Sequence, residues 1–425
     1  ACYFIKTRTE IIKTGFFVKD FNHLACMKNL TKSEWFLTSG MALVVFLMHV
    51  VVNATTAYGY FRDELYYLAC SNHLAWGYVD QPPLSIFLLK IGRLLFGDSL
   101  VAIRLIPALL HGLVIVFTAR ICKQMGGNMF AILASTLAMA TAPVLVAMMS
   151  FYSMNAIDIF IWTLVYYLVL KLQYQNSKAN WMTLGFVLGL GLLNKISVLF
   201  LGAGIGVAIW ITWRNSFQTR WPYIAGSIAF VLFLPYVLWN ATNDWAHLEF
   251  IRNASVGKYA GRSPLDFLVE QFLNMNPLAA PMWLAGLAAL LFYKPLRASK
   301  SIAWIYLTAF IILLVNRTSK GEYLAPAYAG LFAAGAVWLE AQATTVFNWL
   351  RNVYVLLLAA SFFLLAPLVI PVLPVEKYIA YAATLGMSPT SSENKKLAEL
   401  PQHYADMFGW EEKARDVADV YNTLT

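Results

Sequence analysis

The strongest constraint on this chain is a series of apolar segments, most of them about long enough to cross a lipid bilayer, that fills most of its 425 residues. A spanning helix needs about 20 mainly apolar residues. The run 181–213 is too long for one straight span and holds Asn194-Lys195 in its middle, so we expect two short helices there. About eleven spans result: 35–56, 99–120, 128–148, 152–172, two in 181–213, 222–240, 276–293, 301–315, 323–341 and 351–373.

The composition agrees with an all-α, polytopic transmembrane helical bundle. The chain is 60% hydrophobic and 12% charged, whereas soluble domains are about 45–50% apolar and about 25% charged. Its net charge of +9 comes from Lys and Arg residues scattered between the apolar segments. Nucleic-acid-binding proteins gather such residues in a patch or stripe. We therefore expect membrane lipids, and no nucleic acid, among the partners.

The basic residues also indicate the topology, because cytoplasmic loops are enriched in Lys and Arg. If the N-terminus is cytoplasmic, every second loop between the spans contains basic residues. These residues are Arg120, Lys123, Lys171, Lys178, Arg214, Arg220, Lys294, Arg297, Lys300 and Arg351. This predicts a cytoplasmic leader over 1–34, a transmembrane domain over 35–374 and an outer-side segment over 375–425. That last segment ends without an obvious fold boundary, so we expect the natural domain to continue.

The outer side receives a first loop over 57–98 and a long loop over 241–275. The first loop should carry a short surface helix near 63–75 and an interfacial helix over 83–96, where Lys90 and Arg93 share one side. The tail should carry an amphipathic helix near 410–421.

The first loop concentrates chemistry in a chain that is poor in charge, with Arg62, Asp63, Glu64 and Asp80 close together. A carboxylate at this place could act as a general base toward a hydroxyl group. The alternative is that acidic residues at a helix start complement the helix dipole. Asp158, near the outer end of a span, is either functional or a packing and capping carboxylate.

Basic residues on the outer side suggest an anionic ligand such as a lipid phosphate. Lys195 lies at the break in a long apolar run, and Lys320 precedes Tyr323 closely. Arg262 lies in the long loop, which could act as a lid over the ligand. The alternative for each cation is contact with lipid headgroups or solvent.

Several motifs together resemble the GT-C membrane glycosyltransferases that use polyprenyl-phosphate sugars, which include lipid A aminoarabinose transferases and protein O-mannosyltransferases. The motifs are Phe-Arg-Asp-Glu-Leu-Tyr-Tyr at 61–67, Trp-Gly-Tyr-Val-Asp-Gln-Pro-Pro at 76–83, Gly-Leu-Leu-Asn-Lys at 191–195, Asn-Pro-Leu at 276–278, Trp-Leu-Ala-Gly-Leu at 283–287, Glu-Tyr-Leu-Ala-Pro-Ala-Tyr at 322–328 and Leu-Pro-Gln-His-Tyr-Ala-Asp-Met-Phe-Gly-Trp at 400–410. Asp80-Gln81 stands where the aminoarabinose transferases have Glu-Lys, which argues against aminoarabinose as the donor sugar.

The resemblance implies an inverting glycosyltransferase that moves a sugar from a polyprenyl-phosphate donor to a hydroxyl of a lipid, glycan or protein. It implies Asp63 as the base with Glu64 beside it, and an acidic residue at the position of Asp158. We expect the donor and acceptor to be bound by Arg62, Tyr66, Tyr67, Asp80, Lys195, Arg262, Lys320 and Tyr323. No cofactor is firmly expected, and a divalent metal ion on Glu64 or Asp158 stays open.

The expected location is a bacterial inner membrane, with the active site on its periplasmic or extracellular side. The competing interpretation is a transporter or flippase of lipid-linked sugars, which would share the many spans and the outer basic groups. It would not need a pair of carboxylates in a loop.

Overall fold

The computed structural model describes residues 28–258, 261–342, 345–389, 393 and 398–424. Most of the expected leader, residues 1–27, lies outside the described residues. The first helix, α1 (Lys32–Thr55), begins at a capping box in which Thr31 and Glu34 satisfy each other's backbone N–H groups. Such a box is a typical helix start.

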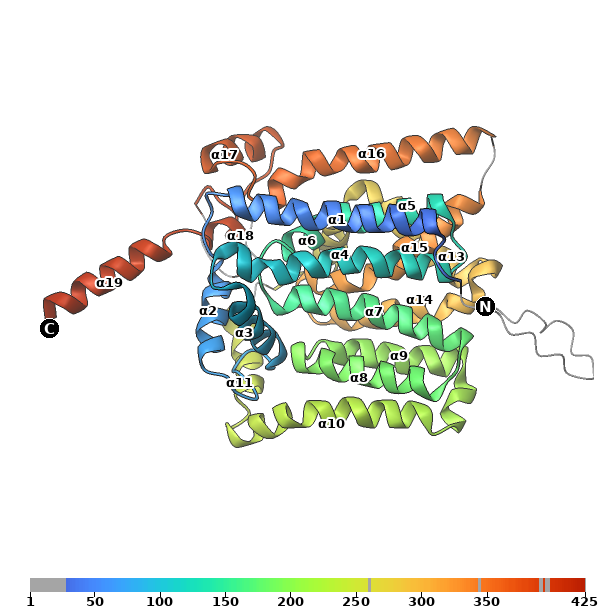
Figure 1. Ribbon diagram of the computed structural model, residues 1–425, viewed down its shortest axis with the longest axis horizontal. Helices are drawn as coiled ribbons and strands as arrows, with labels where there is room; N and C mark the ends of the chain where they lie inside the picture. The colour runs from blue at the N-terminus through green and yellow to red at the C-terminus, as the bar shows by residue number, and fades with distance from the viewer. Residues whose placement is uncertain (1–27, 259–260, 343–344, 390–392, 394–397, 425) are drawn as a thin grey trace, which may run out of the picture.

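The long helices lie side by side along one direction and form a bundle (Figure 1). Besides α1 they are α4 (Leu100–Gln124), α7 (Met154–Tyr174), α8 (Lys178–Asn194), α9 (Val198–Thr212), α10 (Trp221–Thr242), α13 (Ala280–Phe292), α14 (Lys300–Val315), α15 (Ala329–Ala341) and α16 (Thr345–Val369). Two further helices of the bundle, α5 (Met129–Thr141) and α6 (Pro143–Met148), are separated by a break at Ala142. The all-α polytopic class is confirmed.

Among the described residues, seven helices are long and apolar enough to cross a membrane. An eighth results if α12 (Pro264–Asn274) and the segment Pro277–Phe292, which meet at a bend of 93°, are one broken span. Helices α5 and α9 are apolar but shorter. Each expected span corresponds to helical structure, while the figure of about eleven spans stays a prediction.

Short helices collect at one end of the bundle, which we call the short-helix end (Figure 1). They are α2 (Arg62–Asn72), α3 (Leu84–Phe96), α11 (Ala246–Asn253), α17 (Val375–Thr384) and α18 (Gln402–Ala405). Helices α2 and α3 confirm the two helices expected in the first loop. The long loop 241–275 is largely helical, since it contains α11, the π-helical segment η2 (Ala254–Lys258) and α12.

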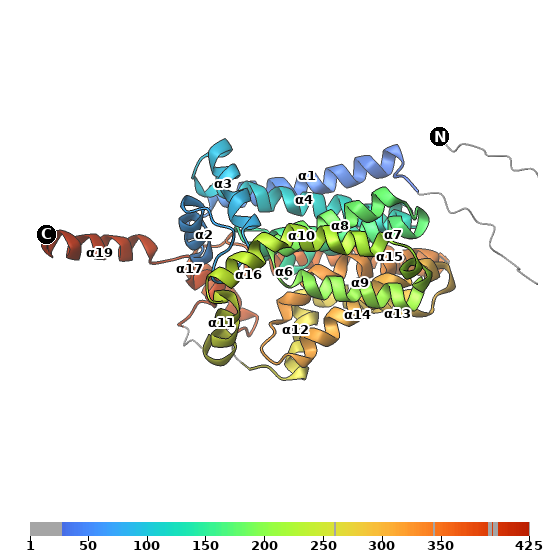
Figure 2. The ribbon, with the colours of Figure 1, turned by 90° about the horizontal axis from the view of Figure 1, so that it is seen from below.

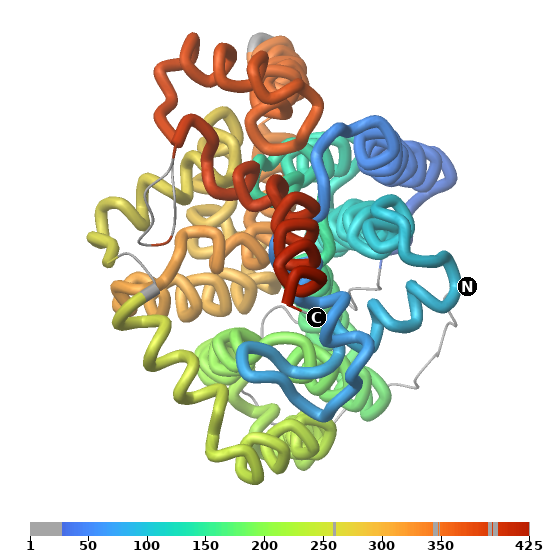
Figure 3. Tube along the Cα trace, turned by 90° about the vertical axis from the view of Figure 1, so that its left-hand side faces the viewer, coloured from blue at the N-terminus to red at the C-terminus, as the bar shows by residue number. Residues whose placement is uncertain are grey.

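The tail ends in α19 (Trp410–Leu424), as expected, and this helix projects away from the bundle (Figure 2). No residue of α19 is buried against the described part of the chain. Figure 3 looks onto the short-helix end and shows the tail crossing it next to the first loop. The tail therefore belongs to the same end as the first-loop motifs.

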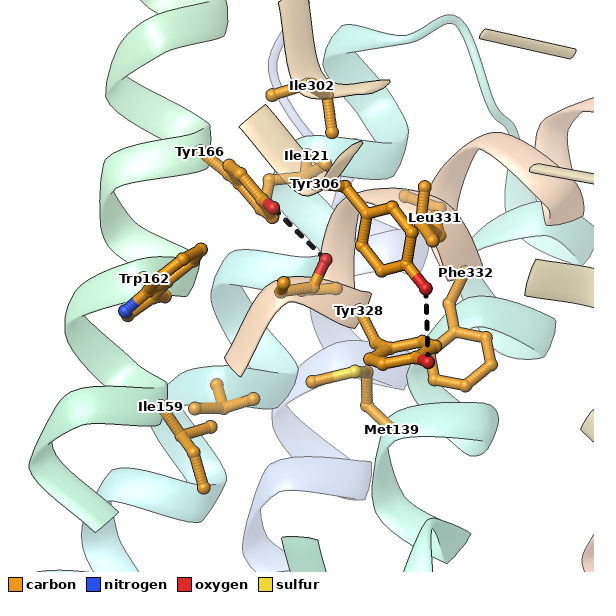
Figure 4. Packing of buried hydrophobic residues seen from close by; sticks show 14 of the residues in the cluster. Ile121, Met139, Ile159, Trp162, Tyr166, Ile302, Tyr306, Tyr328, Leu331 and Phe332 are labelled. Carbon is orange, nitrogen blue, oxygen red and sulfur yellow. Dashed lines mark hydrogen bonds between the residues drawn. The ribbon is translucent and has the colours of Figure 1, made fainter. Parts of the chain in front are cut away.

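The core behind this end is tightly packed around buried tyrosines (Figure 4). The hydroxyl groups of Tyr306 and Tyr328 lie 3.2 Å apart, and Tyr166 donates to the carbonyl of Ala327 at 3.1 Å. Helices α13 and α15 approach so closely that a Cβ atom on Gly286 would lie 2.0 Å from the carbonyl oxygen of Leu331. Small residues permit such backbone contact between membrane helices. The packing fixes η5 (Gly321–Tyr328) against α7.

Candidate functional site

Helix α2 places its two first-turn acids in different surroundings. Successive residues on an α-helix point about 100° apart, so Asp63 and Glu64 cannot face the same way. Glu64 points into the protein and is fully buried, whereas the side chain of Asp63 is 47% exposed. The geometry therefore separates Asp63, which was expected to be the base, from Glu64, which was expected beside it.

Glu64 is saturated with hydrogen-bond donors. Its Oε1 accepts from Arg104 Nε at 2.8 Å and from the Tyr152 N–H at 2.8 Å. Its Oε2 accepts from Arg104 Nη2 at 2.7 Å and from the Phe61 N–H at 2.9 Å. A carboxylate has about four acceptor positions, and all are used. The catalytic role expected for Glu64, and the metal-binding role that the sequence left open, both conflict with this arrangement, which makes Glu64 a structural anchor for α2.

Arg104 is the residue of this site that the sequence analysis missed. It is 1% exposed and also donates to Asn53 at 3.1 Å and to the carbonyl of Gly59 at 3.2 Å. It is a charged residue in the second turn of the apolar helix α4, and such residues usually pair with another charge. That rule, applied to the span 99–120, would have indicated a buried carboxylate partner.

Asp63 Oδ1 accepts a hydrogen bond from Arg62 Nε at 3.2 Å. Arg62 also forms ion pairs with Glu393 at 3.4 Å and with Asp406 at 3.1 Å. Three carboxylates thus surround one guanidinium group. This leaves Asp63 accessible and Arg62 engaged, which weakens the expected substrate-binding role of Arg62.

Tyr66 and Asp80 form a second polar contact beside Asp63. The Tyr66 hydroxyl donates to Asp80 Oδ1 at 2.7 Å. Burial raises the pKa of Asp80, and the hydrogen bond from Tyr66 partly opposes that rise. The loop before Asp80 is held against α10, because a Cβ on Gly77 would lie 2.4 Å from the ring of Trp239.

Tyr67 is buried and connects the first loop to the start of α7. Its hydroxyl accepts from the Met154 N–H at 3.3 Å, and its ring packs edge-on against Tyr152 with centroids 5.9 Å apart. The carbonyl of the same Met154 accepts from Asn194 at 2.9 Å. Tyr67 thus supports the site from within, and the start of α7 lies between Tyr67 and the break after Asn194.

Lys195 occupies the break between α8 and α9, where the sequence predicted it. Its ammonium donates to Asn155 Oδ1 at 2.7 Å and lies 3.6 Å from Asp158 Oδ2. It also lies 5.1 Å from the ring centroid of Tyr323. Asp158 is 1% exposed, accepts from Ser197 at 3.4 Å and leaves Oδ1 without a hydrogen-bond partner among the described residues. The structure therefore brings Asp158, Lys195 and Tyr323 together.

Arg262 lies in the long loop, which contacts the segment that carries Lys320. The guanidinium of Arg262 pairs with Glu270, whose other oxygen accepts from the Gly321 N–H at 2.8 Å. Lys320 lies 3.8 Å from the carboxylate of Glu322. Glu270 thereby ties the long loop to the segment that carries Lys320, and the Arg262 N–H donates to the carbonyl of Arg317 at 2.9 Å.

The two carboxylates considered for a metal ion do not fit one. Glu64 has no acceptor position left, and Asp158 lies beside an ammonium group. Within the described ranges, no group of three or more His, Cys, Asp or Glu side chains could hold a metal ion.

Comparison with known proteins shows which solved structures share this architecture. The family model described as dolichyl-phosphate-mannose-protein mannosyltransferase matches residues 80–239. The crystal structure of ArnT from Cupriavidus metallidurans bound to undecaprenyl phosphate superposes with a TM-score of 0.66 at 18% identity, over 83% of this chain and 69% of that one. This chain has the GT-C glycosyltransferase fold. The family resemblance expected from the motifs is confirmed.

Two further proteins that are similar to this chain are informative. Lipid A galacturonosyltransferase RgtD from Rhizobium johnstonii is 25% identical over 319 residues, which cover 71% of this chain and 65% of RgtD. The chain thus spans about two thirds of that relative's length. The apo oligosaccharyltransferase of Archaeoglobus fulgidus matches with a TM-score of 0.51 at 13% identity, over 86% of this chain and 56% of its own.

Proposed function

We propose that this chain is an inverting glycosyltransferase that moves a sugar from a polyprenyl-phosphate donor to a hydroxyl acceptor at the outer face of a membrane. One observation carries the proposal. An accessible carboxylate, Asp63, and a cation at a helix break, Lys195, lie on elements that meet at the start of α7. Their chemistry matches the two needs of the reaction, which are a base for the acceptor and a positive charge for the phosphate.

Asp63 is the proposed general base. It accepts the proton of the acceptor hydroxyl as that oxygen attacks the anomeric carbon of the sugar. A bond forms between the acceptor oxygen and this carbon, while the bond from the carbon to the phosphate oxygen breaks. The electron pair of the broken bond stays on the lipid phosphate. Attack from the face opposite the phosphate inverts the configuration, and phosphate can leave without an added proton.

Lys195 is the proposed contact of the departing phosphate. An ammonium group has three donors, of which one is given to Asn155. Asp158 lies close enough to hold the charge in place, so we assign Asp158 to orienting Lys195. We propose Lys320 as a second cation that contacts the departing phosphate. Preorganised positive charge of this kind stabilises charge that develops in a transition state.

The membrane setting follows from the arrangement of charge. The expected cytoplasmic residues, such as Lys123 and Lys171, lie near the ends of helices that point away from the short-helix end. The positive-inside rule then puts the short-helix end on the outer side. We propose a bacterial inner membrane with a periplasmic site.

The relatives favour transfer over transport. RgtD is named a galacturonosyltransferase, and the ArnT structure is bound to undecaprenyl phosphate. These names support a lipid-linked donor and give no support to a flippase. A transfer assay with several donors and acceptors identifies the donor sugar and the acceptor.

The test is transfer of labelled sugar by the purified protein in detergent. Polyprenyl phosphates that carry galacturonic acid, mannose or aminoarabinose serve as donors, and lipid A, a glycan or a peptide serves as acceptor. The parent is expected to transfer one of these sugars, and Asp63→Asn is expected to bind the donor without transferring it. Movement of lipid-linked sugar across vesicles by both proteins, with transfer by neither, would support the transporter instead.

A further inference from the structure

The tail motif at 400–410 is docked on the first loop, although the function proposed above makes no use of it. Tyr404 is 1% exposed, and its ring lies 5.1 Å from that of Tyr58. Phe408 also packs against Tyr58, with ring centroids 4.8 Å apart. A Cβ on Gly59 would lie 3.0 Å from the carbonyl oxygen of Met407. Tyr404, Met407 and Phe408 therefore all contact the start of the first loop.

Asp406 is the centre of this contact. Its backbone carbonyl accepts from the Arg62 N–H at 3.0 Å and from the Trp410 indole at 2.9 Å. Its carboxylate lies 3.1 Å from Arg62 Nη1 and accepts from Gln402 at 3.3 Å. Backbone and side chain of one tail residue thus hold both the backbone and the guanidinium of Arg62.

Because Arg62 is held in place by the tail, it also holds the side chain of Asp63. Its Nε donates to Asp63 Oδ1, while its two terminal nitrogens are held by Glu393 and Asp406. A guanidinium is a planar fork, so fixing two of its nitrogens also fixes the direction of the third. Asp63 is otherwise half-exposed on a helix start, where its side chain could rotate freely. A general base must be held within hydrogen-bond reach of the proton that it takes.

We propose that the tail segment 400–410 is part of the active site, because Asp406 positions the Asp63 carboxylate through Arg62. The inference rests on the proposed role of Asp63 as the base. We assign Arg62 and Asp406 as positioning residues, because in this proposal they act through Asp63. This accounts for a cation that is surrounded by three carboxylates beside the site.

The kinetic test compares Arg62→Met, Asp406→Asn and the double variant, with rates normalised to monodisperse protein. Each single change is expected to lower kcat for sugar transfer about tenfold or more, with the donor KM within about twofold, because misplacing a catalytic group mainly costs rate. The double variant should be no slower than the slower single variant, since both act through one contact. Arg62→Lys should recover part of the loss at most.

The matched control is the exposed pair Glu411 and Arg415 on α19, 3.4 Å apart in the same tail. Glu411→Ala and Arg415→Ala should leave kcat unchanged. A rise in donor KM with unchanged kcat in Arg62→Met would instead make Arg62 a substrate ligand, and independent losses in the two single variants would also overturn the positioning role.

A second arm needs no substrate. Thermal unfolding of the parent, the two single variants and the double variant measures the coupling free energy between Arg62 and Asp406. Proteolysis of the same proteins reports release of the tail. Both measurements should show that the two residues act together. Absence of coupling in a protein that transfers sugar overturns the positioning role alone. A parent that transfers no sugar with any donor overturns the proposed function, and the positioning role with it, even where the coupling is present.

Discussion

The two sides of α2 show how one short helix can serve stability and chemistry at once. On its buried side, Glu64 and Arg104 form a closed network in which both carboxylate oxygens carry two donors. On its open side, Asp63 accepts from Arg62 and is 47% exposed. The difference teaches that an acidic pair in sequence is not a catalytic pair in space. The buried acid fixes the helix, so that the exposed one has a defined position.

The largest expected effect comes from removing the exposed acid. Asp63→Asn should lower sugar transfer by about 10²–10⁴-fold, which is the usual contribution of a general base. Stability should change by less than about 0.5 kcal/mol, as for most surface substitutions. Transfer kinetics and thermal unfolding in the same detergent check both parts. Full activity in this variant would remove Asp63 from the mechanism.

The buried side should respond in the opposite way. Glu64→Gln leaves Arg104 buried without its counter-charge, which typically costs about 3–5 kcal/mol. The melting temperature should fall clearly, while the protein that remains folded should keep most of its transfer activity. The double variant Glu64→Leu with Arg104→Met should recover stability, because an apolar replacement of a buried ion pair is often nearly neutral. A stable but inactive Glu64→Gln protein would return Glu64 to catalysis.

These two residues also show what the sequence could and could not predict. The apolar segments, the break at Lys195 and the two first-loop helices are visible in local patterns, because they depend on neighbouring residues. The different fates of Asp63 and Glu64 depend on which face of α2 meets Arg104, 40 positions away. Arg62 pairs with Glu393, 331 positions away. A charge in an apolar helix, such as Arg104, indicates that a partner exists, but a single sequence does not identify that partner. It therefore cannot separate Glu64 from Asp63, nor can it show that Arg62 pairs with the tail.

A smaller effect is expected at the helix break. Lys195→Gln removes the charge proposed to meet the phosphate, and hydrogen bonds to charged groups are worth about 1.5–3 kcal/mol. Transfer should therefore fall about 10–100-fold. The matched control is Lys90→Gln, which removes a charge from α3 without touching the residues around Asp158. Equal losses in the two variants would indicate a general effect of surface charge.

The smallest effect concerns the pH dependence at Asp80. A carboxyl whose folded-state pKa is raised is harder to ionise in the folded protein, so it reduces stability above that pKa. The penalty disappears as the pH falls toward the ordinary value of 3.8. Compared with Asp80→Asn, the parent should gain stability when the pH falls from 7 through this window, as followed by thermal unfolding. A constant difference between the two proteins would contradict the raised pKa.

The contact between the tail and the first loop can form only late in the synthesis of the chain. Arg62 leaves the ribosome early, whereas its partner Glu393 follows 331 positions later. At about 5–20 residues per second, that interval lasts about 15–70 s. Throughout it the first loop is already made while the tail that holds it does not yet exist. Under the arrangement proposed here, a chain interrupted before residue 400 would carry its base without the support that aims it, so synthesis itself would decide when the enzyme starts to work.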